Sequence, residues 1–74
     1  MNKFRIRPYG VGELASLYFP HIQQQSAVSQ LRRWITEYPE LLRELEMAGW
    51  KRYRKILTPR QVHVLVLFLG EPGL

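Results

Sequence analysis

A stripe of apolar residues with helical spacing is the clearest pattern along the chain. It follows the i, i+4, i+7, i+8, i+11 spacing of a helix with one buried face, at Ala27, Leu31, Trp34, Ile35 and Tyr38. We predict a helix that begins at residue 24 or 26 and ends at residue 37, with Ser26 as a candidate N-cap. At about 100° per residue, the opposite face is polar. It contains Gln25, Ser26, Ser29, Arg33 and Thr36, flanked by Gln30 and Arg32.

Proline and glycine residues delimit two shorter helices. Residues 12–19 are expected to form a helix that ends before Pro20. Its apolar face is formed by Val11, Leu14, Ala15 and Tyr18. Pro39 suits the first position of a further helix that ends at Gly49. The inward side chains of that helix are Leu41, Leu42, Leu45 and Ala48.

The last predicted helix has clear start and stop signals. Thr58 and Gln61 form a capping box with Pro59 at the first helical position, and Gly70 and Pro72 close the other end. These signals favour a helix although the segment is rich in β-branched residues. Its core face is formed by Val62, Leu65, Val66 and Leu69. Three further apolar residues, Val64, Leu67 and Phe68, imply either a central helix or a patch that contacts another protein.

Two segments have the character of strands. Residues 3–9 alternate basic and apolar side chains, which suits a short half-buried strand. Residues 50–57, which interleave cations with aromatic residues, form either a strand paired with residues 4–6 or an exposed hairpin-like wing. The predicted fold is therefore mainly all-α. It is one small four-helix domain over residues 1–74, with a helix-turn-helix-like first pair and an optional two-stranded β ribbon.

Composition limits the classes of function. The 74 residues contain no cysteine, which excludes disulfides and thiolate zinc sites. No signal peptide or membrane-spanning run is visible, so we expect a cytoplasmic protein that does not bind membranes. The net charge is +5, yet Glu37, Glu40, Glu44 and Glu46 cluster in one short window. Because most of the cations lie elsewhere, a positive side that attracts a polyanion is expected.

Catalysis has no support in the sequence. The two histidines, His21 and His63, lie far apart, and the chain has no aspartate to orient either of them. It also lacks a glycine-rich phosphate loop and the spacing of a metal site. We therefore expect a protein that is not an enzyme and needs neither cofactor nor metal.

Duplex DNA binding is the function that the pattern favours. The base-reading candidates lie on the helix at residues 24–37, because Gln pairs with adenine and Arg with guanine in the major groove; they are Gln25, Ser26, Ser29, Gln30 and Arg33. The phosphate-contact candidates are Arg5, Arg7, Lys51, Arg52, Arg54 and Lys55. The alternative is a protein-interaction module that forms a homodimer or binds a partner through Val64, Leu67 and Phe68.

The chain also resembles known families at two levels. Nearly its full length is similar to a family of short Bacteroidetes proteins of unknown function; the motifs that carry the resemblance are Tyr9-Gly10, Gly12-Glu13-Leu14-Ala15, Tyr18-Phe19-Pro20, Leu31-Arg32-Arg33-Trp34-Ile35, Pro39-Glu40-Leu41, Thr58-Pro59-Arg60-Gln61-Val62 and Leu69-Gly70-Glu71-Pro72. A shorter set resembles MerR-like and excisionase-like winged helix-turn-helix domains, at Gly12-Glu13-Leu14-Ala15, Leu31-Arg32-Arg33-Trp34 and Tyr53-Arg54-Lys55-Ile56-Leu57-Thr58-Pro59. This second resemblance implies a DNA-binding transcriptional regulator or excisionase-like accessory protein.

Overall fold

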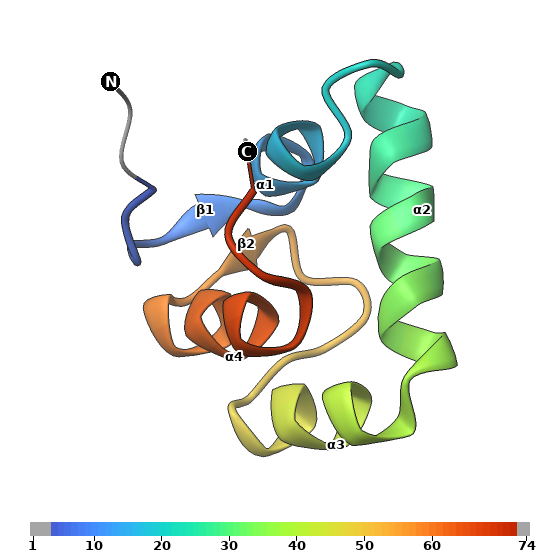
Figure 1. Cartoon of the computed structure of the whole chain (residues 1–74). Helices are drawn as coiled ribbons and strands as arrows, with labels where there is room; N and C mark the ends of the chain where they lie inside the picture. Colours follow the sequence, from blue (N-terminus) through green and yellow to red (C-terminus); the bar gives the residue numbers. More distant parts are fainter. Residues whose placement is uncertain (1–3, 73–74) are drawn as a thin grey trace.

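Four helices and a two-stranded antiparallel sheet make up residues 4–72, the part of the chain that the computed structural model describes (Figure 1). In chain order the elements are β1 (Tyr9–Gly10), α1 (Val11–Tyr18), α2 (Gln24–Glu37), α3 (Pro39–Met47), β2 (Ile56–Leu57) and α4 (Pro59–Leu69). α1 packs on α2, α2 on α3 and α3 on α4. The predicted mainly helical fold is thus confirmed, including the small β ribbon. No helix within residues 4–72 is long and apolar enough to cross a membrane.

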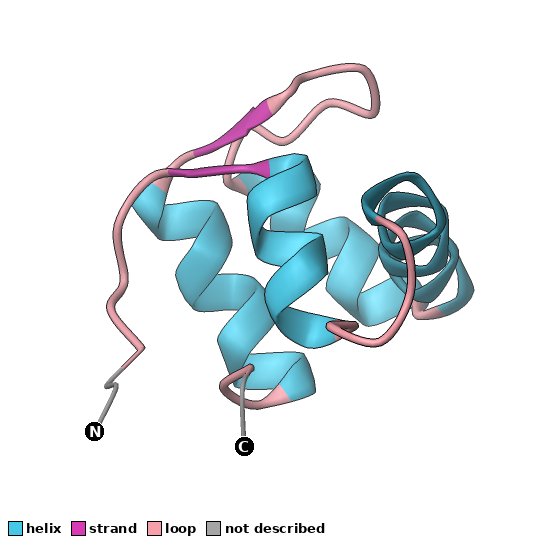
Figure 2. Cartoon of the chain, turned by 90° about the horizontal axis from the view of Figure 1, so that it is seen from above, coloured by secondary structure: helices cyan, strands magenta, loops and turns pink. Residues whose placement is uncertain are grey.

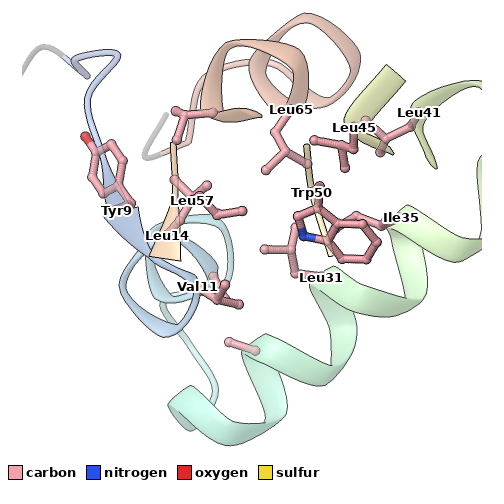
Figure 3. Packing of buried hydrophobic residues seen from close by; sticks show 13 residues of the cluster. Tyr9, Val11, Leu14, Leu31, Ile35, Leu41, Leu45, Trp50, Leu57 and Leu65 are labelled. Atoms are coloured by element: carbon pink, nitrogen blue, oxygen red, sulfur yellow. The ribbon is translucent and has the colours of Figure 1, made fainter. Parts of the chain in front are cut away.

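One hydrophobic core joins all six elements (Figure 3). Its largest fully buried side chains are Leu14, Leu31, Leu41, Leu45, Leu57, Val62 and Leu65. Trp50, in the loop after α3, belongs to the same cluster and is only 8% exposed. Trp34, expected to be a core anchor, is half-buried and packs edge-on against Phe19 with ring centroids 4.8 Å apart. Trp50 is thus the more deeply buried of the two tryptophans.

The first and last turns of the helices follow the local sequence, with two exceptions on α2. Ser26 is not the N-cap, because α2 begins two residues earlier and Gln23 occupies that position. Tyr38 does not extend the buried stripe and is 53% exposed. Its extended backbone (φ −108°, ψ 97°) ends α2, as expected for a residue that precedes a proline. At the end of α3, Gly49 has φ +89°, which agrees with the predicted stop.

The predicted strand at residues 3–9 is wrong in extent and in partner. Residue 3 lies outside the described residues, and of the others only Tyr9 belongs to a strand. The segment instead folds against the Tyr9 side chain: Phe4 stacks on its ring at 5.4 Å, and the Tyr9 hydroxyl donates to the Arg5 carbonyl at 2.9 Å. The partner of β2 is therefore Tyr9–Gly10, paired as Tyr9↔Leu57 and Gly10↔Ile56, and not residues 4–6.

The start of α4 is tied to the end of α3 by Gln61. The Gln61 backbone N–H donates to Thr58 Oγ1 at 3.2 Å, and the Thr58 N–H donates back to Gln61 Oε1 at 3.1 Å. This reciprocal pair is the predicted capping box. Gln61 Nε2 also donates to the Ala48 carbonyl at 3.0 Å. The amide of Gln61, a residue only 4% exposed, therefore satisfies backbone groups of two helices at once.

We predict that Gln61→Glu destabilises the fold by about 1–3 kcal/mol. The carboxylate keeps the acceptor for Thr58 but loses the donor to Ala48, so that two acceptors then face each other in a buried place. Urea unfolding at neutral pH measures the change. Gln25→Glu, at an exposed position in the first turn of α2, is the matched control and should shift stability by less than about 0.5 kcal/mol. Equal effects of the two substitutions would contradict the role given to Gln61.

A hydrogen bond from Tyr18 links the end of α1 to the end of α4. Its hydroxyl donates to the Gly70 carbonyl at 2.7 Å. Burial, with a smaller contribution from the Glu71 carboxylate, raises the pKa of Tyr18 from 10.0 to about 12. The neutral phenol is therefore favoured in the folded state over the unfolded chain.

This shift predicts a loss of stability in alkali. Since the pKa is higher in the folded state, the contribution of Tyr18 is fully present below pH 10 and is lost as the pH rises to about 12. Unfolding free energies measured across this range should fall more steeply for the native sequence than for Tyr18→Phe. The variant should be less stable at neutral pH by about 0.5–1.5 kcal/mol, because its hydrogen bond is missing. Parallel pH profiles would show that Tyr18 does not carry the effect.

Candidate nucleic-acid interface

The outward face of α2 gathers the five base-reading candidates in one place. Four of them are exposed and Gln30 is half-buried. Together they line one shallow hollow along the helix, formed by Gln25, Ser26, Ser29, Gln30 and Arg33. Figure 1 shows α2 at the edge of the molecule, where this face is not covered by another helix. The periodicity therefore predicted correctly that these residues share a face.

The only negative charge on α2 lies at its C-terminal end. The helix has no acidic residue before Glu37, its last position. Arg33 Nε lies 3.7 Å from Glu37 Oε2, and both side chains are largely exposed. Such an exposed ion pair contributes little free energy, so the guanidinium remains available to a ligand. The hydroxyl of Thr36 donates to the carbonyls of Arg32 and Arg33 and is therefore already engaged.

The loop between α3 and β2 carries four exposed cations between two buried anchors. Trp50 and Leu57 are 8% and 1% exposed, and both belong to the core. Two backbone hydrogen bonds shape the loop: Arg54 N–H donates to the Lys51 carbonyl, and Val11 N–H donates to the Lys55 carbonyl. Within residues 4–72 only two ion pairs form, and neither involves this loop. Its positive charge is therefore uncompensated by carboxylates in direct contact.

The loop lies beside the C-terminal half of α2. Lys51, Arg52 and Tyr53 line a hollow together with Thr36 of α2. Figure 2 shows this loop projecting from the two-stranded sheet of β1 and β2, on the side away from the N-terminal segment. Lys51 and Arg52 thus lie at the edge of the polar face of α2. The sequence alone did not show whether these cations lie near α2.

Arg5 and Arg7 lie at the other end of the β ribbon. Because Tyr9 pairs with Leu57 and Gly10 with Ile56, residues before Tyr9 extend away from residues 51–55. The guanidinium of Arg7 also donates to Glu13 Oε2 at 3.0 Å and lies over the Tyr9 ring at 3.8 Å. The hydrogen bond from Arg7 lowers the pKa of Glu13. The six phosphate-contact candidates therefore do not form one continuous patch.

The interaction-patch candidates occupy a different part of the surface. On α4, Leu67 is 69% exposed and Phe68 is 40% exposed, whereas Val64 is half-buried. Phe68 lies beside Tyr38 and Pro39 in one hollow and beside Glu44 in another. This apolar patch is thus bordered by the charged side chains of Glu40, Arg43 and Glu44 on α3, two acidic and one basic, whereas the loop carries cations alone.

The two histidines and the metal-ligating side chains are dispersed in the described part of the chain. His21 and His63 are both exposed and lie on different segments. Within residues 4–72, no three metal-ligating side chains come together. The pattern of apolar and polar residues predicted neither the burial of Trp50 nor the position of Glu46 in the hollow beside Lys51. For Trp50, its place directly after the glycine that ends α3 was the available signal.

Comparison with known proteins gives a family without an assigned activity. Neither the curated proteins nor the solved structures include a significant match to the chain. A family model described as Domain of unknown function (DUF4248) matches residues 5–72. Since this match spans nearly the whole chain, the protein belongs to the DUF4248 family of domains of unknown function.

Proposed function

We propose that this protein binds duplex DNA without catalysing a reaction, with α2 in the major groove. The observation that carries the proposal is the uncovered polar face of α2 with uncompensated cations at its edge. α2 has 14 residues and is about 21 Å long, and a helix of ordinary diameter fits a groove about 12 Å wide. In this pose Gln25, Gln30 and Arg33 read base edges, and Ser26 and Ser29 contribute shorter-range hydrogen bonds.

Phosphate contact is assigned first to the loop after α3. Lys51 and Arg52 share an edge with α2, and Arg54 and Lys55 continue the same exposed turn. Arg5 and Arg7 belong to a second, more distant group, and Arg7 is already paired with Glu13. One module of this size buries little area on DNA, so useful affinity requires a second copy or a partner protein.

The local resemblance to MerR-like and excisionase-like domains supports the same proposal by analogy. It covers the motif that opens α1, the Leu31-Arg32-Arg33-Trp34 motif of α2 and the segment that leads into α4. In this proposal the protein is a bacterial regulator or accessory factor that acts on DNA in the cytoplasm.

The two groups of residues should respond differently to substitution. Arg33→Ala should weaken binding to the preferred site by about 10- to 100-fold and relax its sequence preference, because one base contact is lost. Lys51→Ala with Arg52→Ala should weaken binding to every sequence and reduce the salt slope by about 2, because two phosphate contacts are lost. Fluorescence anisotropy with random and selected duplexes at several salt concentrations measures both effects.

The double variant Arg43→Ala with Arg60→Ala is the matched control. It removes the same charge from exposed positions on α3 and α4 and should change affinity only slightly. If this control weakens binding as much as the loop variant does, then net charge rather than a defined surface explains the binding. If Arg33→Ala and the loop variant both bind normally, then the assigned surface is wrong.

A second candidate function is protein interaction through α4, favoured by the exposure of Leu67 and Phe68. A helix that leaves two large apolar side chains in solvent is typical of a contact surface. In this alternative the protein forms a homodimer or binds a partner without a nucleic-acid role, and its cations only maintain solubility.

Leu67→Glu should abolish such a contact and leave a folded monomer, since the Leu67 side chain is 69% exposed. Sedimentation measures the mass of the native sequence and the variant, and circular dichroism checks the fold. Met47→Glu on α3, at a residue 68% exposed, is the matched control and should leave the mass unchanged. A native protein that sediments as a monomer and elutes alone from its host extract would contradict the alternative.

A further inference from the structure

A hollow beside the proposed DNA-reading face has features that duplex binding does not explain. It has a volume of about 540 Å³ and lies between the end of α2, α3 and the loop that follows α3. This volume falls within the range of small-ligand sites in proteins. Trp50 contributes to its lining although the residue is only 8% exposed, so part of the hollow reaches the hydrophobic core.

An aromatic ring and two cations stand together on the rim of the hollow. Tyr53 is 75% exposed, and none of the close aromatic pairs within residues 4–72 includes it. Lys51 and Arg52 lie in the same lining, and neither takes part in an ion pair within that part of the chain. An exposed aromatic residue next to free cations is the combination that single-strand-binding proteins use to stack a base and hold its phosphate.

The lining of the hollow also includes a carboxylate. Glu46 is exposed and, like Thr36, borders the hollow. The single proton of the Thr36 hydroxyl is already donated to α2 carbonyls, and the Glu46 carboxylate is the one anionic acceptor in this lining. A carboxylate repels phosphate but accepts hydrogen bonds from the N–H groups of a base.

We propose that this hollow binds an unpaired nucleotide of a single-stranded nucleic acid. The base stacks on Tyr53, its phosphate lies at Lys51 and Arg52, and Glu46 accepts from an N–H on its Watson–Crick edge. In a duplex that edge is occupied by the partner base, so the carboxylate discriminates between unpaired and paired bases. The inference shares the loop cations Lys51 and Arg52 with the proposed function, but it uses a surface other than the outward face of α2 and does not require duplex binding.

The binding of a short oligothymidylate of about eight nucleotides tests the proposal. Anisotropy of the labelled strand, with the unmodified chain as reference, should show about tenfold weaker binding for Tyr53→Ala. Tyr38→Ala is the matched control, because Tyr38 is also an exposed tyrosine but lies at the corner of α2 and α3. The affinity of Tyr38→Ala for the oligothymidylate should equal that of the unmodified chain. Circular dichroism confirms that both variants are folded.

Glu46→Ala gives the sharper result. If the carboxylate accepts from the base, then its removal weakens binding even though the protein becomes more positive. Glu44→Ala, which removes an exposed charge on another face of α3, is the control and should bind equally well or more tightly. Tighter binding by Glu46→Ala, or unchanged binding by Tyr53→Ala, would overturn the proposal.

The outcomes separate this inference from duplex binding. If random duplex binds and depends on Arg33 while Tyr53→Ala leaves oligothymidylate binding unchanged, then the inference fails alone. If duplex does not bind but oligothymidylate binds and depends on Tyr53 and Glu46, then duplex binding by α2 fails and the inference stands. If neither probe binds at low salt, then both are rejected.

Discussion

The hydrogen bonds of Gln61 set the relation between the two helices on which the loop depends. Its amide accepts from the Thr58 N–H, which begins α4, and donates to the Ala48 carbonyl, which lies at the end of α3. Because the residue is nearly fully buried, these groups have no water to replace a lost partner. No buried side-chain polar atom within residues 4–72 lacks a hydrogen-bond partner. The two helix ends are therefore held together, and the chain between them forms a closed loop.

The burial of Trp50 and Leu57 at the two ends of this loop determines what it displays. Since both anchors belong to the core, the cations between them are forced to the surface, where they remain hydrated. The pairing of Ile56 with Gly10 and the bond from Val11 to the Lys55 carbonyl hold the loop against the start of α1. The positive edge of the molecule thus follows from apolar packing and backbone pairing. Repulsion among like charges opposes this arrangement and is overcome by the core.

The two proposals place different nucleic-acid structures on neighbouring surfaces. The outward face of α2 is long and polar and suits a groove, whereas the hollow beside it has an aromatic rim and an acidic acceptor. Both use Lys51 and Arg52, so one phosphate backbone can pass from one surface to the other. The charged residues of α3 that lie near Phe68 line a separate hollow, which shares no residue with either of these surfaces.

The sequence by itself determined features that depend on neighbours a few residues apart. The capping box at Thr58, the stop at Gly49 and the face shared by Gln25, Ser29 and Arg33 arise from backbone geometry and helical period, and the structure agrees with each. Tyr38 was misplaced because the following proline ends the helix. The strand was misplaced because Phe4, the Arg5 carbonyl and Arg7 contact the Tyr9 side chain. Only the tertiary structure decided the register of β1 with β2 and the position of the cationic loop beside Thr36. These depend on contacts between distant segments, which no local pattern encodes.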